Sequence, residues 1–340
     1  MSKRAAMQAF GRRGHLVGVH SNAMSVACGC SRGSSRLKSA EVAPLPRGIS
    51  PQLAYWIDFN SHLTPTALGL PVTEAAAAAM YGLSLADYEA YLASVREEVN
   101  ARAEVLLTRP LWPEAIDHLP VPRGGTLLAI GDSITTYRHG YVELLRALLA
   151  RRRPEDGVRV LNRGYSGYTS AQGLAATYSY FLGHRPDLVF IGYGGNDCKR
   201  FGQPPGKTLV SIEEFAANME AIIAAFQTLS KARLVLLTPA PVIESVVNPS
   251  EASVEYASRR MTWSNADVES FAQVVRDLGQ RQGLPVVDLV AAFGREPDSS
   301  LYLPDGLHPN LEGQQIVLEL ALRAAAGPGP DGRWVSPEWE

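Results

Sequence analysis

Two short motifs in this chain carry the residue types needed for nucleophilic catalysis. Ser133 lies in Gly131-Asp132-Ser133, at a point where an apolar run turns toward a helix, so its hydroxyl can be exposed to a substrate. Near the C-terminal end, Asp305 precedes His308 by three residues in a loop bounded by glycine and proline. This spacing allows the carboxylate to hold one imidazole nitrogen while the other acts as a base toward a hydroxyl. Each motif alone has an ordinary explanation, a helix N-cap for Ser133 and a surface loop for His308.

Two further loops offer hydrogen-bond donors of the kind that stabilise a developing negative charge. Gly167 lies in a stretch rich in glycine and tyrosine (162–170), where the backbone can approach a bound group closely. Asn196 follows Gly194-Gly195, and its amide can donate without changing charge, as an oxyanion hole requires. A tight turn is the simpler explanation for each loop. Together, the four motifs supply a nucleophile, a base, an orienting carboxylate and oxyanion donors, which is the inventory for acyl transfer.

The four motifs follow a regular alternation of apolar runs and amphipathic helices. The runs are predicted strands at 126–130, 158–161, 187–191, 234–237 and 285–289, and the predicted helices are 141–152, 170–182, 212–229, 265–282 and 311–325. Continuously apolar strands separated by helices indicate a parallel sheet covered on both faces. In such sheets the working residues gather at the carboxyl ends of the strands, and three of the motifs directly follow a predicted strand.

With these motifs in this order, residues 126–325 resemble the SGNH-type GDSL hydrolases. Ser133, Gly167 and Asn196 match the first three sequence blocks of that family, and Asp305 with His308 matches the last. The sequences of residues 161–168, 215–218 and 238–241 are most similar to those of isoamyl acetate-hydrolysing esterases. The resemblance implies a flavodoxin-like three-layer α/β/α fold around a five-stranded parallel sheet. It also implies ester hydrolysis with no metal or other cofactor, and an oxyanion hole made by the backbone N–H groups of Ser133 and Gly167 and the side chain of Asn196.

The expected function is therefore that of a serine esterase acting on small acyl esters, with acetyl esters favoured. Deacetylation of carbohydrates, thioester or lysophospholipid hydrolysis, and O-acyl transfer would use the same site and stay open. A binding module on a retired hydrolase fold is the non-catalytic alternative. The segment 242–263 is expected to overhang the site, because its Tyr256, Met261 and Trp263 suit a partly apolar substrate.

The chain is expected to divide into four regions. These are a disordered basic leader (1–45), an N-terminal extension (46–122), the hydrolase domain (123–326) and a C-terminal tail (327–340). The proline-rich residues 44–71 predict an extended segment, and a capping box at Ser84 and Asp87 predicts a helix with an apolar stripe up to Leu106. The stripe is expected to pack on the hydrolase domain, and a homodimer contact is the alternative.

Composition excludes several classes of protein. The net charge of −2 argues against nucleic-acid binding, and no apolar run reaches the roughly 18 residues of a membrane-spanning helix. Three cysteines cannot form a disulfide framework. The first 40 residues hold seven basic side chains and no acidic one. This composition resembles an organelle transit peptide, although a disordered leader or a start at Met24 is the simpler explanation. The cytoplasm is the expected location, with organelle targeting or export as alternatives.

Three other sequence features resemble functional motifs but lack the necessary context. Residues 29–33 match the Gly-x-Ser-x-Gly elbow without a preceding core strand. Residues 202–208 fall one residue short of a phosphate-binding loop, and their two prolines lack N–H donors. Cys198 is expected to be a buried or rim thiol.

Overall fold

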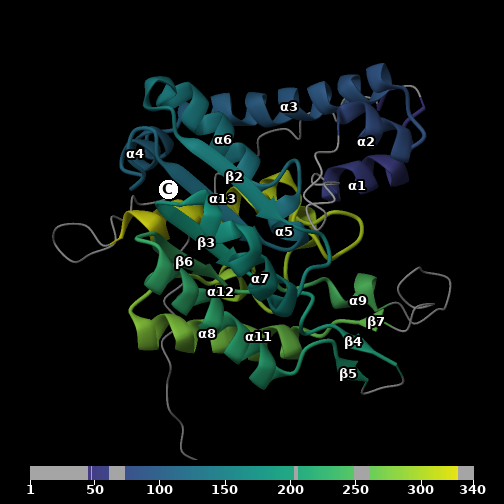
Figure 1. Cartoon of the computed structure of the whole chain (residues 1–340). Coiled ribbons are helices and arrows are strands. Elements are labelled where there is room, and N and C mark those ends of the chain that lie inside the picture. The colour runs from purple at the N-terminus through teal and green to yellow at the C-terminus, as the bar shows by residue number, and fades with distance from the viewer. Residues whose placement is uncertain (1–44, 47, 61–72, 203–205, 249–260, 328–340) are drawn as a thin grey trace, which may run out of the picture. The chain divides into compact units, whose positions relative to one another are not determined.

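Five parallel strands form the central sheet, in the order β2-β1-β3-β6-β8 (Figure 1). Their bounds are Thr126–Gly131 for β1, Arg159–Gly164 for β2, Leu188–Gly192 for β3, Arg233–Leu237 for β6 and Val286–Val287 for β8. The strand order reverses at β1, which pairs with β2 on one side and β3 on the other. The predicted parallel α/β sheet is confirmed, and the point of reversal is where such folds place their ligands.

The register brings the carboxyl ends of three strands to the same level. Gly131, the last residue of β1, lies opposite Gly164 of β2 and Gly192 of β3. The loops that carry Ser133, Gly167 and Asn196 therefore leave the sheet side by side.

The coordinates are those of a computed structural model that describes residues 45, 46, 48–60, 73–202, 206–248 and 261–327. All of these residues belong to one compact unit. The predicted leader and tail lie outside the described residues, apart from Leu45 and Gly327 at their edges. No helix in the described ranges combines the length and apolar character that crossing a lipid bilayer requires.

Helices cover both faces of the sheet, because side chains of each strand alternate between two cores. Leu127 and Ala129 of β1 face one core, whereas Leu128 and Ile130 face the other. The first core is covered by α3 (Leu85–Leu107), α4 (Leu111–Asp117), α6 (Tyr141–Arg152) and α13 (Leu311–Ala326), and the second by α7 (Ser170–Ala176), α8 (Ile212–Leu229) and α11 (Asn265–Gln282). Figure 1 shows α3 and α6 on one side of the sheet and α8 and α11 on the other.

Several short elements complete the described chain. After α7 the chain continues as a π-helical turn, η3 (Thr177–Phe181), so the α-helix predicted over 170–182 ends early. A small antiparallel sheet has the order β5-β4-β7, with β4 at Arg200–Phe201, β5 at Lys207–Thr208 and β7 at Met261–Thr262. The remaining short helices are α5 (Ser133–Thr136), α9 (Glu244–Val247), α12 (Leu289–Phe293), η2 (Pro154–Asp156), η4 (Leu182–His184) and η5 (Ser299–Leu301).

The N-terminal extension differs from the prediction in its first part. Residues 44–71 were predicted to be extended, but Pro51–Phe59 forms helix α1. The Ser50 side chain accepts a hydrogen bond from Leu53 N, and Pro51 occupies the first helical position. Proline at that position favours helix initiation, because its missing N–H would have no partner there and its φ angle is already helical. A second helix, α2 (Glu74–Met80), follows, and residues 61–72 between the two lie outside the described residues.

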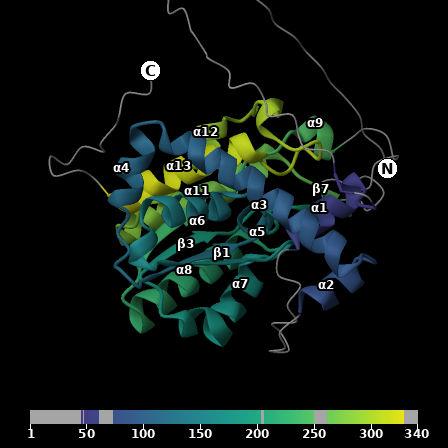
Figure 2. The same ribbon diagram turned by 90° about the horizontal axis from the view of Figure 1, so that it is seen from above.

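Helix α3 is packed within the chain along its whole length. Its C-terminal half places Val99, Ala103 and Leu106 in the core that includes the sheet. Its N-terminal half packs on α1 and α2 through a separate apolar cluster that contains Tyr88, Leu92, Val95 and Ile57. Figure 2 shows α4 near one end of α3 and α1 and α2 near the other.

A partly buried ionic cluster fastens α1 to the rest of the fold. His139 lies 3.6 Å from an Asp58 carboxylate oxygen of α1 and 3.1 Å from a Glu98 oxygen of α3. Tyr91 donates its hydroxyl proton to Asp58 at 2.9 Å. Burial alone would lower the pKa of His139, but hydrogen bonds and charge from Asp58 and Glu98 outweigh it and raise this pKa to about 9. His139 is therefore an imidazolium at neutral pH.

This pKa predicts a pH-dependent contribution of His139 to stability. A folded-state pKa of about 9, above the usual 6.5, gives stabilisation that is complete below pH 6.5 and lost as the pH rises through 9. Wild type should exceed His139→Gln in unfolding free energy by up to about 3 kcal/mol near pH 6, and by much less near pH 10. Denaturant melts across this range measure the difference. The exposed His118→Gln serves as a control, and a His139→Gln difference that stays constant with pH would contradict the assignment.

The extension should contribute to the stability of the whole fold. Leu106 is 0% exposed and Val105, beside it on α3, is 39% exposed. Leu106→Ala should lower the unfolding free energy by about 2–5 kcal/mol, because it leaves a cavity in the shared core. Val105→Ala should change it by less than about 0.5 kcal/mol. Denaturant melts of both variants check this, and equal effects would show that α3 is not integral to the core.

Candidate active site

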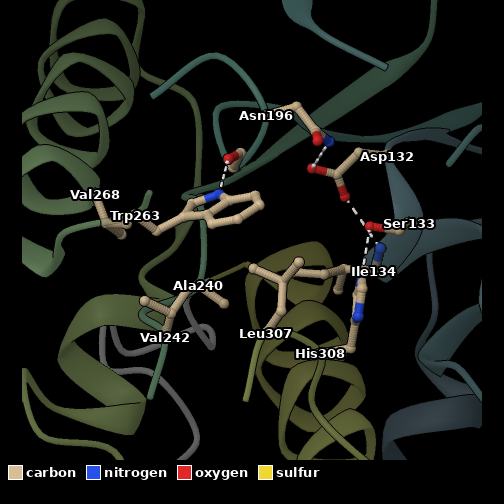
Figure 3. A pocket seen from close by; sticks show the side chains of 11 residues that line it. Asp132, Ser133, Ile134, Asn196, Ala240, Val242, Trp263, Val268, Leu307 and His308 are labelled. Carbon is tan, nitrogen blue, oxygen red and sulfur yellow. Dashed lines mark hydrogen bonds between the residues drawn. The ribbon is translucent and has the colours of Figure 1, made fainter. Parts of the chain in front are cut away.

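Three side chains predicted to act together lie in one hydrogen-bonded line. Ser133 is the first residue of α5, directly after β1, and its Oγ lies 2.8 Å from His308 Nε2. His308 Nδ1 lies 2.6 Å from Asp305 Oδ2. Figure 3 shows the contact between Ser133 and His308, which joins residues 175 positions apart in sequence.

The loop that carries His308 fixes the ring through its own hydrogen bonds. Asp305 Oδ1 accepts from the backbone N–H groups of Leu307 and His308, which leaves Oδ2 facing Nδ1. Burial would raise the pKa of Asp305, but the His308 charge and these hydrogen bonds outweigh it and lower the pKa. The carboxylate is thus ionised and can only accept. Nδ1 therefore donates to Asp305, and Nε2 is left to accept the Ser133 proton.

Glycines allow α5 to sit directly against the ends of β1 and β2. A Cβ atom on Gly131 would lie 2.4 Å from Thr135 Oγ1, and one on Gly164 would lie 2.4 Å from the backbone nitrogen of Thr136. Both distances are far inside van der Waals contact. The close approach sets the position of Ser133, and Asp132 caps α5 by accepting from Ile134 N at 3.0 Å.

Asn196 reaches the site from the loop after β3, with a fixed amide orientation. Its Oδ1 accepts from Lys199 Nζ at 3.1 Å, and its Nδ2 lies 3.4 Å from Asp132 Oδ2. An ammonium group only donates and a carboxylate accepts, so both neighbours favour the same orientation. The donor end of the amide faces Asp132 (Figure 3).

Sequence reasoning missed the parts played by Asp132 and Lys199. Asp132 is buried, and its desolvation raises its pKa to about 6, although the Ile134 N–H and the charges of His308 and Lys199 oppose the shift. The position of Asp132, an acidic residue directly after a buried strand, was the sequence signal that could have indicated this role. Burial lowers the pKa of Lys199, and its position three residues after Asn196 gave no comparable signal.

Gly167 lies in the loop after β2 but is not among the residues that line the pocket. Its φ of +80° is in the left-handed region, and an added Cβ would meet nothing within 4 Å. Backbone conformation rather than space therefore favours glycine there. The loops after β2 and β3 are joined by Asp197, which accepts from Ser170 N at 3.0 Å and from Ser170 Oγ at 2.5 Å.

The pocket beside Ser133 is small and largely apolar. Its volume is about 20 Å³, and its apolar side chains are Ile134, Ala240, Val242, Trp263, Val268 and Leu307. Trp263 lies across the pocket from Ser133 and donates its indole N–H to Gly195 O at 3.0 Å (Figure 3). The segment 242–263 was predicted to overhang the site, and its first and last residues, Val242 and Trp263, line the pocket. Tyr256 lies outside the described residues.

The other sequence features form no second centre in the described residues. Cys198 is fully buried, burial raises the pKa of its thiol, and its Sγ donates to Gly195 O. No group of three or more potential metal ligands occurs in the described ranges. Residues 202–208 follow β4 and end with β5, with 203–205 outside the described residues, and residues 29–33 lie outside them altogether.

Comparison with known proteins places this chain in a family. Residues 129–316, more than half of the chain, match the model of the GDSL-like Lipase/Acylhydrolase family. The chain belongs to this family. The predicted family and the predicted class, a carboxylic ester hydrolase, are therefore confirmed. Helices α1 to α4 precede the part of the chain that the family model matches.

The relatives of this GDSL hydrolase are distant in sequence, but the alignments include most of the length of each relative. The human isoamyl acetate-hydrolyzing esterase 1 homolog is 28% identical over an alignment of 200 residues, and the match covers 56% of this chain and 77% of that protein. An acetylxylan esterase from Geobacillus stearothermophilus is 27% identical over an alignment of 225 residues, and the match covers 60% of this chain and 95% of that protein. Among solved structures, the α/β hydrolase LAE5 from the metagenome of Lake Arreo has 30% identity and a TM-score of 0.49, covering 61% of this chain and 97% of its own.

Proposed function

We propose that this GDSL hydrolase cleaves small acyl esters, acetyl esters first, with Ser133 as nucleophile, His308 as general base and Asp305 as its orienting carboxylate. The observation that supports this most directly is the hydrogen-bonded line from Asp305 through His308 to Ser133, which ends at a small apolar pocket.

The proposed reaction uses the protonation states that the hydrogen bonds favour. His308 Nε2 takes the Ser133 proton as Oγ attacks the ester carbonyl, and the imidazolium is stabilised by ionised Asp305. The tetrahedral intermediate then collapses, and His308 gives the proton to the departing alcohol. Water repeats the sequence on the acyl-enzyme, which releases the acid and restores Ser133.

Three donors are proposed for the negative charge that develops on the carbonyl oxygen. They are the backbone N–H groups of Ser133 and Gly167 and the side-chain amide of Asn196. Asn196 has the strongest support, because it lines the pocket and its amide is oriented by Lys199 and Asp132. The assignment of Gly167 as a donor rests on its match to the family pattern and on its place at the same edge of the sheet.

The size of the pocket supports a short acyl group. A volume of about 20 Å³ has room for little more than one water-sized group, since a single such group needs about 10–15 Å³. An acetyl methyl suits this space, whereas a longer chain would extend beyond it. The names of two relatives, for isoamyl acetate and acetylxylan, also refer to acetyl esters. They differ in the alcohol, so carbohydrate deacetylation, other ester classes and acyl transfer to an acceptor stay open for this chain.

An acyl-length series on p-nitrophenyl esters tests the proposed substrate class. The value of kcat/KM should be highest for acetate and fall at least about tenfold by octanoate, because the apolar pocket cannot hold the longer chain. Ser133→Ala should remove the activity on every ester. Equal rates on acetate and octanoate would contradict the short-acyl assignment, and an active Ser133→Ala variant would contradict the nucleophile.

Replacing Asn196 tests the oxyanion assignment. Asn196→Ala should lower kcat on p-nitrophenyl acetate by about 10²–10³, or roughly 2.7–4 kcal/mol, as the loss of one oxyanion donor does elsewhere. A thermal melt of the same preparation controls for folding. Hydrolysis at the wild-type rate would remove Asn196 from the mechanism.

A further inference from the structure

Two aromatic side chains of α1 contact the ring of His308. The centroids of the Phe59 and His308 rings lie 4.2 Å apart, with 36° between the ring planes. Tyr55 places its ring centroid 6.1 Å from that of His308 and its hydroxyl 3.5 Å from Nδ1. Tyr55 and His308 are 253 positions apart, and α1 lies outside the region that the family model matches.

The Tyr55 contact falls on the side of the imidazole that faces Asp305, and the Phe59 ring packs against the imidazole ring itself. The Tyr55 hydroxyl approaches Nδ1, whereas Nε2 faces Ser133. Neither Tyr55 nor Phe59 lines the pocket, although His308 does. Helix α1 therefore covers the Asp305–His308 pair and leaves the substrate side open. His308 is 4% exposed, and a hydrogen bond shielded from water in this way is electrostatically stronger than an exposed one.

Phe59 also connects the base to the helix of the nucleophile. Its ring is stacked on Tyr137 at 4.6 Å, with 8° between the planes. Tyr137 is the residue directly after α5, the helix that begins at Ser133. The rings of His308, Phe59 and Tyr137 thus form one continuous row, so a displacement of Phe59 would affect both ends of the bond between Ser133 and His308.

The C-terminal end of α1 is held firmly enough to position a ring. Arg138 donates from Nε to Ile57 O at 3.1 Å and from its backbone N–H to Asp58 O at 3.2 Å. The Asp58 carboxylate contacts His139 and Tyr91, as described above. All of these contacts are made by the two residues that precede Phe59.

We propose that α1 is a working part of the active site, in which Phe59, with Tyr55 beside it, is a positioning residue for His308. The proposal rests on the esterase function proposed above. Phe59 limits the orientations of the imidazole and keeps water from its bond to Asp305. Its loss should therefore slow proton transfer to and from His308 while leaving ester binding in the pocket unchanged.

Steady-state kinetics on p-nitrophenyl acetate with the full chain test this role. Phe59→Ala should lower kcat by about 10–100-fold with KM within about twofold, because a small misplacement of a catalytic group can cost about 10² in rate. Phe59→Leu, which keeps bulk without the ring, should give an intermediate kcat. The matched control is Trp56→Ala, which removes another large aromatic side chain from the same helix at a position that is 43% exposed. It should keep the wild-type kcat.

A second readout separates positioning from a loss of folded protein. The rate at which a fluorophosphonate labels Ser133 depends on His308 as base, and the final extent of labelling counts the competent sites. In Phe59→Ala the labelling rate should fall in parallel with kcat while the extent of labelling stays complete. If Phe59→Ala does not fold, Phe59→Leu decides the matter, with an expected loss of at least fivefold in kcat per labelled site.

Failure of this inference and failure of the proposed function give different results. An active wild type and an inactive Ser133→Ala, together with a wild-type kcat per site in Phe59→Ala or Phe59→Leu, would overturn the positioning role alone. A wild type that hydrolyses no ester and resists the fluorophosphonate would overturn the esterase function and this inference with it. If Trp56→Ala and Phe59→Ala lose the same amount of kcat per labelled site, the positioning role is overturned as well.

Discussion

The 2.8 Å hydrogen bond between Ser133 and His308 depends on structure drawn from both ends of the hydrolase region. Ser133 is held by the register of the sheet, in which the last residues of β1, β2 and β3 lie level and α5 packs directly on them. His308 is held by a short closed loop, in which Leu303 N donates to His308 O and an isolated bridge pairs Tyr302 with Pro309. The relative position of these two supports is set by the core between them and, on the outer side, by α1.

The two carboxyl groups of the site have separate tasks. Asp305, whose pKa is lowered, accepts from the imidazole, whereas Asp132, whose pKa burial raises to about 6, accepts from the amide of Asn196. The amide of Asn196 lies between Asp132 and Lys199, with its oxygen toward the ammonium and its nitrogen toward the carboxyl group. A preorganised amide of this kind needs no reorientation when charge develops nearby, which is the main advantage of fixed dipoles over water.

Much of this arrangement could be predicted from the sequence, because β1 and β3 are largely apolar strands and are followed within a few residues by Ser133 and Asn196. The order of the four motifs was enough to expect that Ser133 and His308 meet. Helix α1 was not predictable in the same way. The prolines of residues 44–71 suggested extended chain, although Pro51 stands at a helix start, where proline is favourable. The contact between Phe59 and His308 is tertiary packing across about 250 residues, which no local spacing encodes, and the pairing of Lys199 with Asn196 depends on a loop conformation.

The place of α1 to α4 at the start of the chain bears on how the protein is made. These helices leave the ribosome before any strand of the sheet exists, so the apolar face of α3 must wait for α6 and α13 to cover it. Contacts that join such distant parts of a chain close slowly, and apolar surface exposed in the interval favours aggregation or binding by chaperones. The loop of His308 and helix α13 emerge only after every strand of the sheet. Under the proposed mechanism, a nascent chain therefore gains its complete active site only once parts of the chain far apart in sequence have met.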